Sequence, residues 1–122
     1  PEETPGWHSS ELETSQDMAY DPDLVRMERA YPEMAHIPSF LPKSFQKNDG
    51  MPDVEFEGYQ YFTFPMDHHE FVESGTIGNP MRATIEKGEE AFRRLSEHTA
   101  KAVLELTKVP VTVKNREFVD RV

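Results

Sequence analysis

The stretch Trp7-His8-Ser9-Ser10-Glu11-Leu12-Glu13-Thr14-Ser15 decides how this chain folds and where it could do chemistry. It brings one imidazole and two carboxylates together just before a segment with helical spacing. A histidine exchanges protons near neutral pH, and a nearby carboxylate can orient its ring or raise its basicity. The candidate catalytic residues are therefore His8, Glu11 and Glu13. Trp7 is a candidate for lining a substrate pocket or for anchoring the N-terminal arm.

The same residues also have an ordinary interpretation. The apolar spacing predicts a helix from about Ser10 to Tyr20, and Ser9 or Ser10 can cap its start. Acidic residues are favoured in the first turn of a helix because they stabilise the positive end of its dipole. On that interpretation His8 is a solvated loop histidine. Residue types alone leave both interpretations open.

The composition indicates a chain that depends on a partner. Its 122 residues allow one domain or a substantial part of one. The hydrophobic share of 36% and the mean hydropathy of −0.72 are low for a self-sufficient globule. Ten prolines against six glycines indicate long extended segments. We therefore expect another protein chain to complete the core.

The charge and the cysteine content exclude several kinds of partner and site. A net charge of −10 repels phosphate backbones and anionic lipid, so we expect neither a nucleic-acid nor a membrane partner. No apolar run approaches the roughly 18 residues of a membrane span, and no signal peptide is visible. The sequence has no cysteine, so it has no disulfide and no thiolate site. We expect a cytoplasmic protein.

We predict a single partial domain over residues 1–122, built from segments of different composition. They are a site loop with two helices (1–30), a proline-rich arm (31–57), a short strand and turn (58–74), a turn with a long packing helix (75–108) and a tail (109–122).

Particular residues mark the elements within these segments. Asp21 and Pro22 predict the start of a second short helix that runs through Met27. The aromatic run Tyr59–Phe64 predicts a strand that Pro65 ends. Residues 109–113 alternate weakly and predict an edge strand.

The predicted long helix starts at Asn79-Pro80 or at Thr84 and runs to about Lys108. Its apolar residues keep to one face, which also carries Gly88 and Thr99: Ile85, Phe92, Leu95, Ala102 and Leu106. The missing side chain of Gly88 permits close packing against a sheet or a helix. A coiled coil is a weaker alternative because the pattern lasts barely three heptads.

The segment Asp67-His68-His69-Glu70 has the residue types of a metal site. Adjacent histidines in a strand point to opposite faces, so both rarely reach one ion. An exposed polar turn is the other interpretation, and its role stays open.

Two stretches together resemble the creatininase family. Residues 8–15, followed by Asp21-Pro22-Asp23-Leu24-Val25, are similar to a family segment that reads His-x-Gly-x-x-Glu-Thr-Ser and continues into Pro-Asp-Leu-Val. Residues 75–80, with Ala83-Thr84 and Glu86-Lys87-Gly88, are similar to the turn and last helix of that family. Ser10 stands where the family motif has glycine, which predicts a stiffer loop.

The resemblance implies an α/β fold of three layers with a central, mainly parallel sheet, of which this chain is the C-terminal part. It also implies metal-dependent hydrolysis of amide C–N bonds. His8 matches the family histidine that passes a proton to the leaving nitrogen. Glu13 matches a carboxylate that orients or supports the site, and Glu11 matches an acid found in many members.

The metal ligands of that family are absent from this sequence, which lacks its Glu-x-His and Asn-Gly-His-x-Glu motifs. The resemblance therefore implies that a divalent metal (zinc, manganese or iron) is held by a partner chain carrying the N-terminal half of the fold. We expect a small polar substrate and a higher oligomer. The alternative is a noncatalytic assembly or regulatory subunit of such a complex, and a small acidic binding module outside the family is a third possibility.

Overall fold

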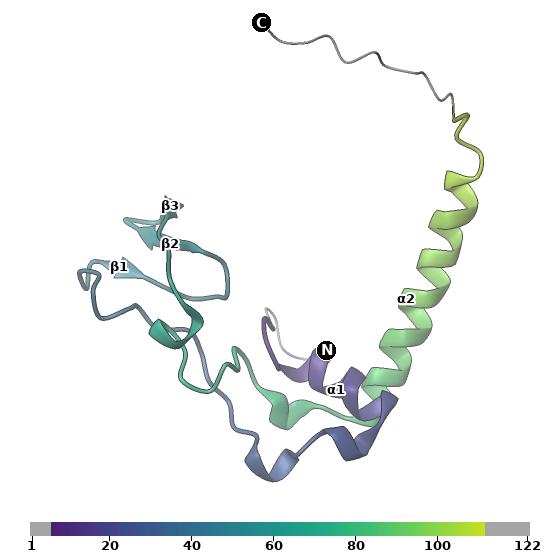
Figure 1. The fold of residues 1–122 in the computed structure, drawn as a ribbon, viewed down its shortest axis with the longest axis horizontal. Coiled ribbons are helices and arrows are strands. Elements are labelled where there is room, and N and C mark those ends of the chain that lie inside the picture. Colours follow the sequence, from purple (N-terminus) through teal and green to yellow (C-terminus); the bar gives the residue numbers. More distant parts are fainter. Residues whose placement is uncertain (1–5, 112–122) are drawn as a thin grey trace, which may run out of the picture.

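The computed structural model describes residues 6–111 (Figure 1). In this part of the chain the α-helices are α1 (Glu11–Tyr20) and α2 (Ile85–Leu106), and the strands are β1 (Phe45–Gln46), β2 (Asp53–Phe56) and β3 (Tyr59–Thr63). Single 3-10 turns lie between them, at Pro22–Leu24, Met27–Arg29, His68–Glu70 and Pro80–Arg82. In space the sheet lies on one side of the molecule and α2 on the other, with α1 between them (Figure 1).

The N-terminal helix forms as predicted. Helix α1 begins at Glu11 and ends at Tyr20. The segment after it is shorter than predicted: the side chain of Asp21 caps a 3-10 turn at Pro22–Leu24 by accepting from the backbone N–H of Asp23. The chain then extends at Val25 before a separate 3-10 turn, Met27–Arg29. The predicted second helix is therefore two turns rather than one element.

The described residues form a three-stranded antiparallel sheet in the order β1-β2-β3. Strand β3 confirms the strand predicted at Tyr59–Phe64, and it ends before Pro65. Strands β1 and β2 lie in the arm that the prolines predicted to be irregular, so that prediction was wrong for its C-terminal part. A mainly parallel sheet is not found within residues 6–111.

Aromatic side chains explain why this short sheet forms. Phe45 and Phe56 are opposite each other across β1 and β2, with ring centroids 4.9 Å apart. Phe62 and Phe64 meet Phe45 edge-on at 6.4 and 5.9 Å. Cross-strand aromatic pairs of this kind stabilise a sheet whose strands are otherwise too short to be stable.

Isolated bridges connect segments that are far apart in the described sequence. Residues Ile77 and Gly78 lie between two segments: His8 pairs with Ile77, and Glu33 pairs with Gly78, both antiparallel. The carboxylate of Glu33 also accepts from the backbone N–H groups of Glu73 and Ser74, at 2.7 and 2.8 Å. The Ser74 hydroxyl also donates to this carboxylate, and that bond, together with the backbone bonds, lowers the pKa of Glu33. The 73–78 segment is thus held on both sides.

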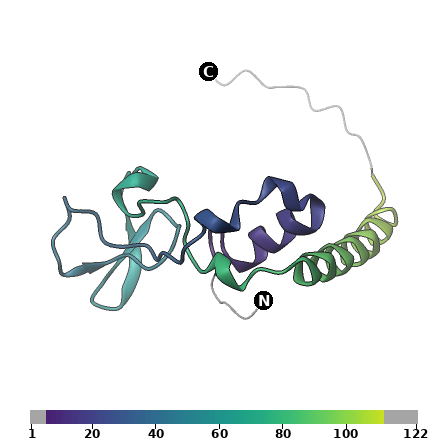
Figure 2. The same ribbon diagram turned by 90° about the horizontal axis from the view of Figure 1, so that it is seen from below.

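Helix α2 crosses α1 near its first turn and then leaves the rest of the molecule (Figure 2). Thr84 caps its start by accepting from the backbone N–H of Lys87, as predicted. Its end at Leu106 is two residues before the predicted one. Every residue from Phe92 to Leu106 is exposed, including Leu95 (58%) and Leu106 (66%). Most of the apolar stripe predicted to pack is therefore uncovered.

The predicted edge strand at residues 109–113 does not form over Val109–Val111, and its last two residues lie outside the described part. Most of the predicted tail also lies outside it. Within residues 6–111, no helix combines the length and the apolar character that crossing a bilayer requires. Apart from prolines and glycines, the buried apolar residues of this part are few: Val54, Phe71, Val72, Ile77 and Ala83.

Candidate functional site

The backbone of His8 is fixed to a segment far along the chain. The carbonyl oxygen of Ile77 accepts from the N–H groups of Trp7 (3.0 Å) and His8 (3.3 Å). The N–H of Ile77 donates to the carbonyl oxygen of His8 at 2.8 Å. Because Ile77 is fully buried, this bridge fixes the main chain at the candidate catalytic histidine. His8 is half-buried rather than a freely solvated loop residue.

The imidazole of His8 lies against two other parts of the chain. A Cβ built on Gly50 would be 3.0 Å from Nε2 of His8, so the absence of a side chain at Gly50 leaves room for the ring. The ring of His68 approaches edge-on, with centroids 4.9 Å apart and planes at 68°. His68 in turn lies 5.0 Å from the ring of Phe71. The site is therefore built from three separate segments of sequence.

Trp7 anchors the N-terminal arm, which is one of its two predicted roles. Its side chain packs against the buried cluster of Phe71, Val72 and Ile77. Its indole Nε1 is buried and has no hydrogen-bond partner within residues 6–111. A buried donor without a partner costs about 1–3 kcal/mol. Within the described residues this donor is therefore an unsatisfied buried group.

Glu13 supports the loop that follows His8. Its Oε2 accepts from the backbone N–H of Ser9 at 2.7 Å. Ser9 has φ +47°, a left-handed conformation that costs roughly 1–2 kcal/mol outside glycine. Ser10, which stands at the glycine of the family motif, has φ −88° and begins the helix. The strained residue is therefore Ser9, and Glu13 stabilises it.

Glu11 lies at the contact of α1 with α2, on the helix side of the loop. Its side chain is 1% exposed, and its Oε1 lies 2.8 Å from Nζ of Lys87, which is 29% exposed. Lys87 Nζ also donates to the carbonyl oxygen of Arg82 at 2.9 Å. This ion pair joins the two helices. Its geometry favours a structural role for Glu11 over a catalytic one.

The last motif residue, Ser15, also joins the helices. Its hydroxyl donates to the carbonyl oxygen of Glu11 at 2.5 Å and accepts from the backbone N–H of Thr84 at 3.1 Å. Thr14 Oγ1 donates to the carbonyl oxygen of Ser9 at 3.1 Å. The Glu13-Thr14-Ser15 pattern therefore serves the helix packing and the loop after His8.

The 3-10 turn His68–Glu70 follows Asp67, and these residues form a reciprocal cap. Asp67 and Glu70 each bond the other's backbone, and both histidines are exposed. No group of three or more His, Asp or Glu side chains in the described residues is arranged to hold a metal ion. The described residues therefore do not fit a metal ion, and the geometry at residues 67–70 favours the polar-turn interpretation.

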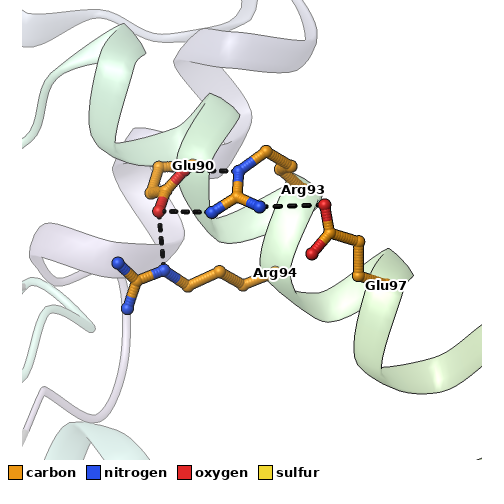
Figure 3. Close-up of polar contacts among 4 residues, drawn as sticks. All are labelled: Glu90, Arg93, Arg94 and Glu97. Carbon is orange, nitrogen blue, oxygen red and sulfur yellow. Dashed lines mark hydrogen bonds and ion pairs between the residues drawn. The ribbon is translucent and has the colours of Figure 1, made fainter. Parts of the chain in front are cut away.

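The solvent-facing side of α2 carries an ion-pair network (Figure 3). Glu90 accepts from Arg93 at 2.7 and 2.8 Å and from Arg94 at 2.6 Å, and Arg93 also bonds Glu97 at 2.8 Å. The hydrogen bonds from Arg93 and Arg94 lower the pKa of Glu90 to about 2. The same pairing raises the pKa of Arg93.

A groove of about 290 Å³ lies next to this network, between the helices. Its lining residues are Glu11, Leu12, Glu86, Lys87, Glu90, Ala91 and Arg94. His8 is not among them, so this groove and the imidazole site are separate features.

Sequence reasoning missed the residues that surround His8. The sequence gives no link between His8 and Gly50 or Lys47, and it predicts His68 only as a metal ligand or as part of an exposed polar turn. The proximity of residues 8, 50 and 68 depends on the tertiary fold, which no local pattern encodes. The Asn48-Asp49-Gly50 turn was the available signal, because a glycine there permits close approach of another group.

Comparison with known proteins identifies a protein family. The sequence model of a protein family described as creatininase, creatinine amidohydrolase, matches residues 1–103. No curated protein and no solved structure matches the chain.

Proposed function

This chain belongs to the creatininase family, and we propose from this that it takes part in hydrolysing an amide C–N bond of a small polar molecule. In such a reaction the oxygen of water bonds to the carbonyl carbon, the C–N bond breaks and the leaving nitrogen takes up a proton. We assign the delivery of that proton to His8. The observation that carries this assignment is that the His8 main chain is fixed to buried Ile77 while its ring is half-buried.

The other predicted site residues take supporting roles in this proposal. Glu13 holds the loop after His8 through its bond to Ser9, so it positions the imidazole without touching the substrate. Trp7 packs against the buried cluster next to His8, so we propose that its ring, rather than its buried N–H, lines the substrate pocket. Glu11 is paired with Lys87, so we place it in the framework of the site.

A partner chain is the second part of the proposal. The exposed apolar face of α2, beyond Phe92, needs a surface to cover it, and a cluster of a few buried residues cannot do so. We propose that this chain is the C-terminal half of a creatininase-like fold with a mainly parallel sheet. The partner would carry the N-terminal half and a divalent metal, zinc, manganese or iron, which the described residues of this chain do not fit. A higher oligomer of such pairs is also expected.

Purification from the native source tests the partner. A second chain with Glu-x-His and His-x-Glu ligands should copurify, and the isolated chain should be inactive. A stable, active monomer would contradict the proposal.

Replacing His8 tests its role within the copurified complex. His8→Ala should lower kcat by about 100-fold or more while assembly is unchanged, since a general acid contributes roughly 10²–10⁴-fold. Creatinine, the substrate named by the family, is the first probe. The matched control is His69→Ala, an exposed histidine next to His68. Unchanged turnover in His8→Ala would remove His8 from the mechanism.

A noncatalytic assembly subunit remains the alternative. It is favoured by the pairing of Glu11 with Lys87, which uses a motif carboxylate for packing. A structure of the complex separates the two: His8 would lie far from any bound metal in an assembly subunit, and close to it in a catalytic one.

A further inference from the structure

Lys47 is a buried lysine outside the family motifs. Its side chain is fully buried, although lysine is among the residues least often buried. Its Nζ donates to the carbonyl oxygens of Asp49 and Met51, both at 2.5 Å, and to Oδ1 of Asp49 at 2.9 Å. Three acceptors match the three protons of an ammonium group. The burial of this charge is therefore compensated by a specific set of bonds.

These bonds close the loop that carries Gly50. Asp49 and Met51 stand on either side of Gly50, and both are bonded to Lys47. Asp49 Oδ1 also accepts from the backbone N–H of Met51 at 2.9 Å, which tightens the same loop. Gly50 is the residue whose missing side chain makes room for the His8 ring. Lys47 thus fixes the loop that lies against one side of the His8 ring.

Lys47 also contacts the residues on the other side of the His8 ring. Its Nζ lies 5.1 Å from the centroid of the Phe71 ring, within the range of a cation–π contact. Phe71 is buried and packs against His68, whose ring meets His8 edge-on. The Lys47 ammonium group therefore contacts both the loop around Gly50 and the ring of Phe71, which support the two sides of the His8 imidazole.

We propose that Lys47 is a positioning residue for His8, acting through the Asp49–Met51 loop on one side and through Phe71 and His68 on the other. The purpose of this positioning rests on the proposed function, because an imidazole that delivers a proton must be held at the leaving nitrogen. The positioning itself is a property of this chain and can be measured without a substrate.

The ring signals of the histidines provide that measurement. The full chain is labelled with ¹³C and ¹⁵N in histidine, and the imidazole resonances are compared between the original chain and Lys47→Met. We expect the signals of His8 and His68 to shift or to split into several conformers. The signals of His98 on exposed α2 and the amide protection of Ile77 should be unchanged, which shows that the fold persists. Lys43→Met, which changes an exposed lysine of the same segment, is the matched control.

Two outcomes overturn the inference. The first is that the amide signals of residues 49–51 shift in Lys47→Met while the ring signal of His8 stays the same as in the original chain. The other applies if Lys47→Met does not fold. The milder Asp49→Asn, which weakens the same loop, then decides: a smaller shift of His8 in the same direction supports the inference, and no shift contradicts it.

Kinetics separate this inference from the proposed function. In the copurified complex with creatinine as probe, Lys47→Met should lower kcat by about 10- to 100-fold with a smaller change in KM, as expected for a misplaced catalytic group. Failure of the original complex to hydrolyse creatinine would count against the proposed function on that substrate. The ring signals would then still decide the role of Lys47.

Discussion

The main chain of Ser15 passes so close to Gly88 that a Cβ on residue 88 would lie 1.9 Å from the Ser15 carbonyl oxygen. It would also lie 2.7 Å from Cβ of Ala19. Gly88 is therefore the point at which the side of α2 packs directly against the main chain of α1. The sequence placed this glycine on the apolar side of the predicted helix, and the close contact gives the reason.

We expect Gly88→Ala to lower the free energy of unfolding by roughly 1–3 kcal/mol, because the obstructing atom is main chain and cannot rotate away. Urea unfolding of the full chain, followed by circular dichroism, measures the change. Ser96→Ala on the exposed part of α2 is the control, since it improves helix propensity without affecting a contact. Equal stability of the two variants would contradict the close packing.

The hydroxyl of Ser15 supplies a second contact between the helices. We expect Ser15→Ala to cost about 1–3 kcal/mol, because it removes the acceptor of the Thr84 N–H at the start of α2. Hydrogen exchange of the Thr84 amide reports this loss directly and should accelerate. Exchange in the exposed turns of α2 serves as the internal reference, and unchanged protection at Thr84 would refute the bond.

The ion pair of Glu11 with Lys87 allows a test of whether Glu11 is structural. We expect Lys87→Met to destabilise the chain near the lower end of the roughly 3–5 kcal/mol typical of buried pairs, because Lys87 is 29% exposed. Thermal unfolding measures it, with exposed Lys101→Met for comparison. A catalytic Glu11 would instead show lost turnover with little change in stability.

The network around Glu90 predicts a pH dependence of α2. The pKa of Glu90 is lowered on folding from 4.5 to about 2, so the pairing stabilises the helix above pH 4.5 and is lost as the pH falls from there towards 2. The effect is small because Glu90 is exposed.

Helix content measured by circular dichroism between pH 5 and pH 2 should therefore fall less steeply in Glu90→Gln than in the original chain. Glu89→Gln, on the same turn but not among the residues of the network, should follow the original curve. Added salt should reduce the difference between the curves. Identical curves for Glu90→Gln and the original chain would exclude the network as a source of stability.

Local signals predicted the local structure well. Helix α1, the cap at Thr84 and strand β3 follow from helical spacing, a threonine before an apolar run and an aromatic alternation. Strands β1 and β2 were missed because their stability comes from Phe45 and Phe56 meeting across strands, which a reading along one segment does not show.

The candidate site was predicted only in part, because a sequence does not show contacts between distant segments. His8 stood out because its residue type and its motif are visible in the sequence. Its surroundings did not, because Gly50 and His68 reach it only through the tertiary fold. Glu11 looked catalytic by type, whereas burial beside Lys87 gives it a packing partner that its sequence neighbours could not reveal.

The bridge between His8 and Ile77 has a consequence for the order of folding. The two residues are 69 positions apart in sequence (77 − 8), so the bridge closes a long loop, whereas the turns of α1 form from contacts within a few residues. Long-range contacts form slowly relative to local helix, so we expect α1 to be present before His8 is seated. The histidine would then reach its final place only when the chain as a whole has closed.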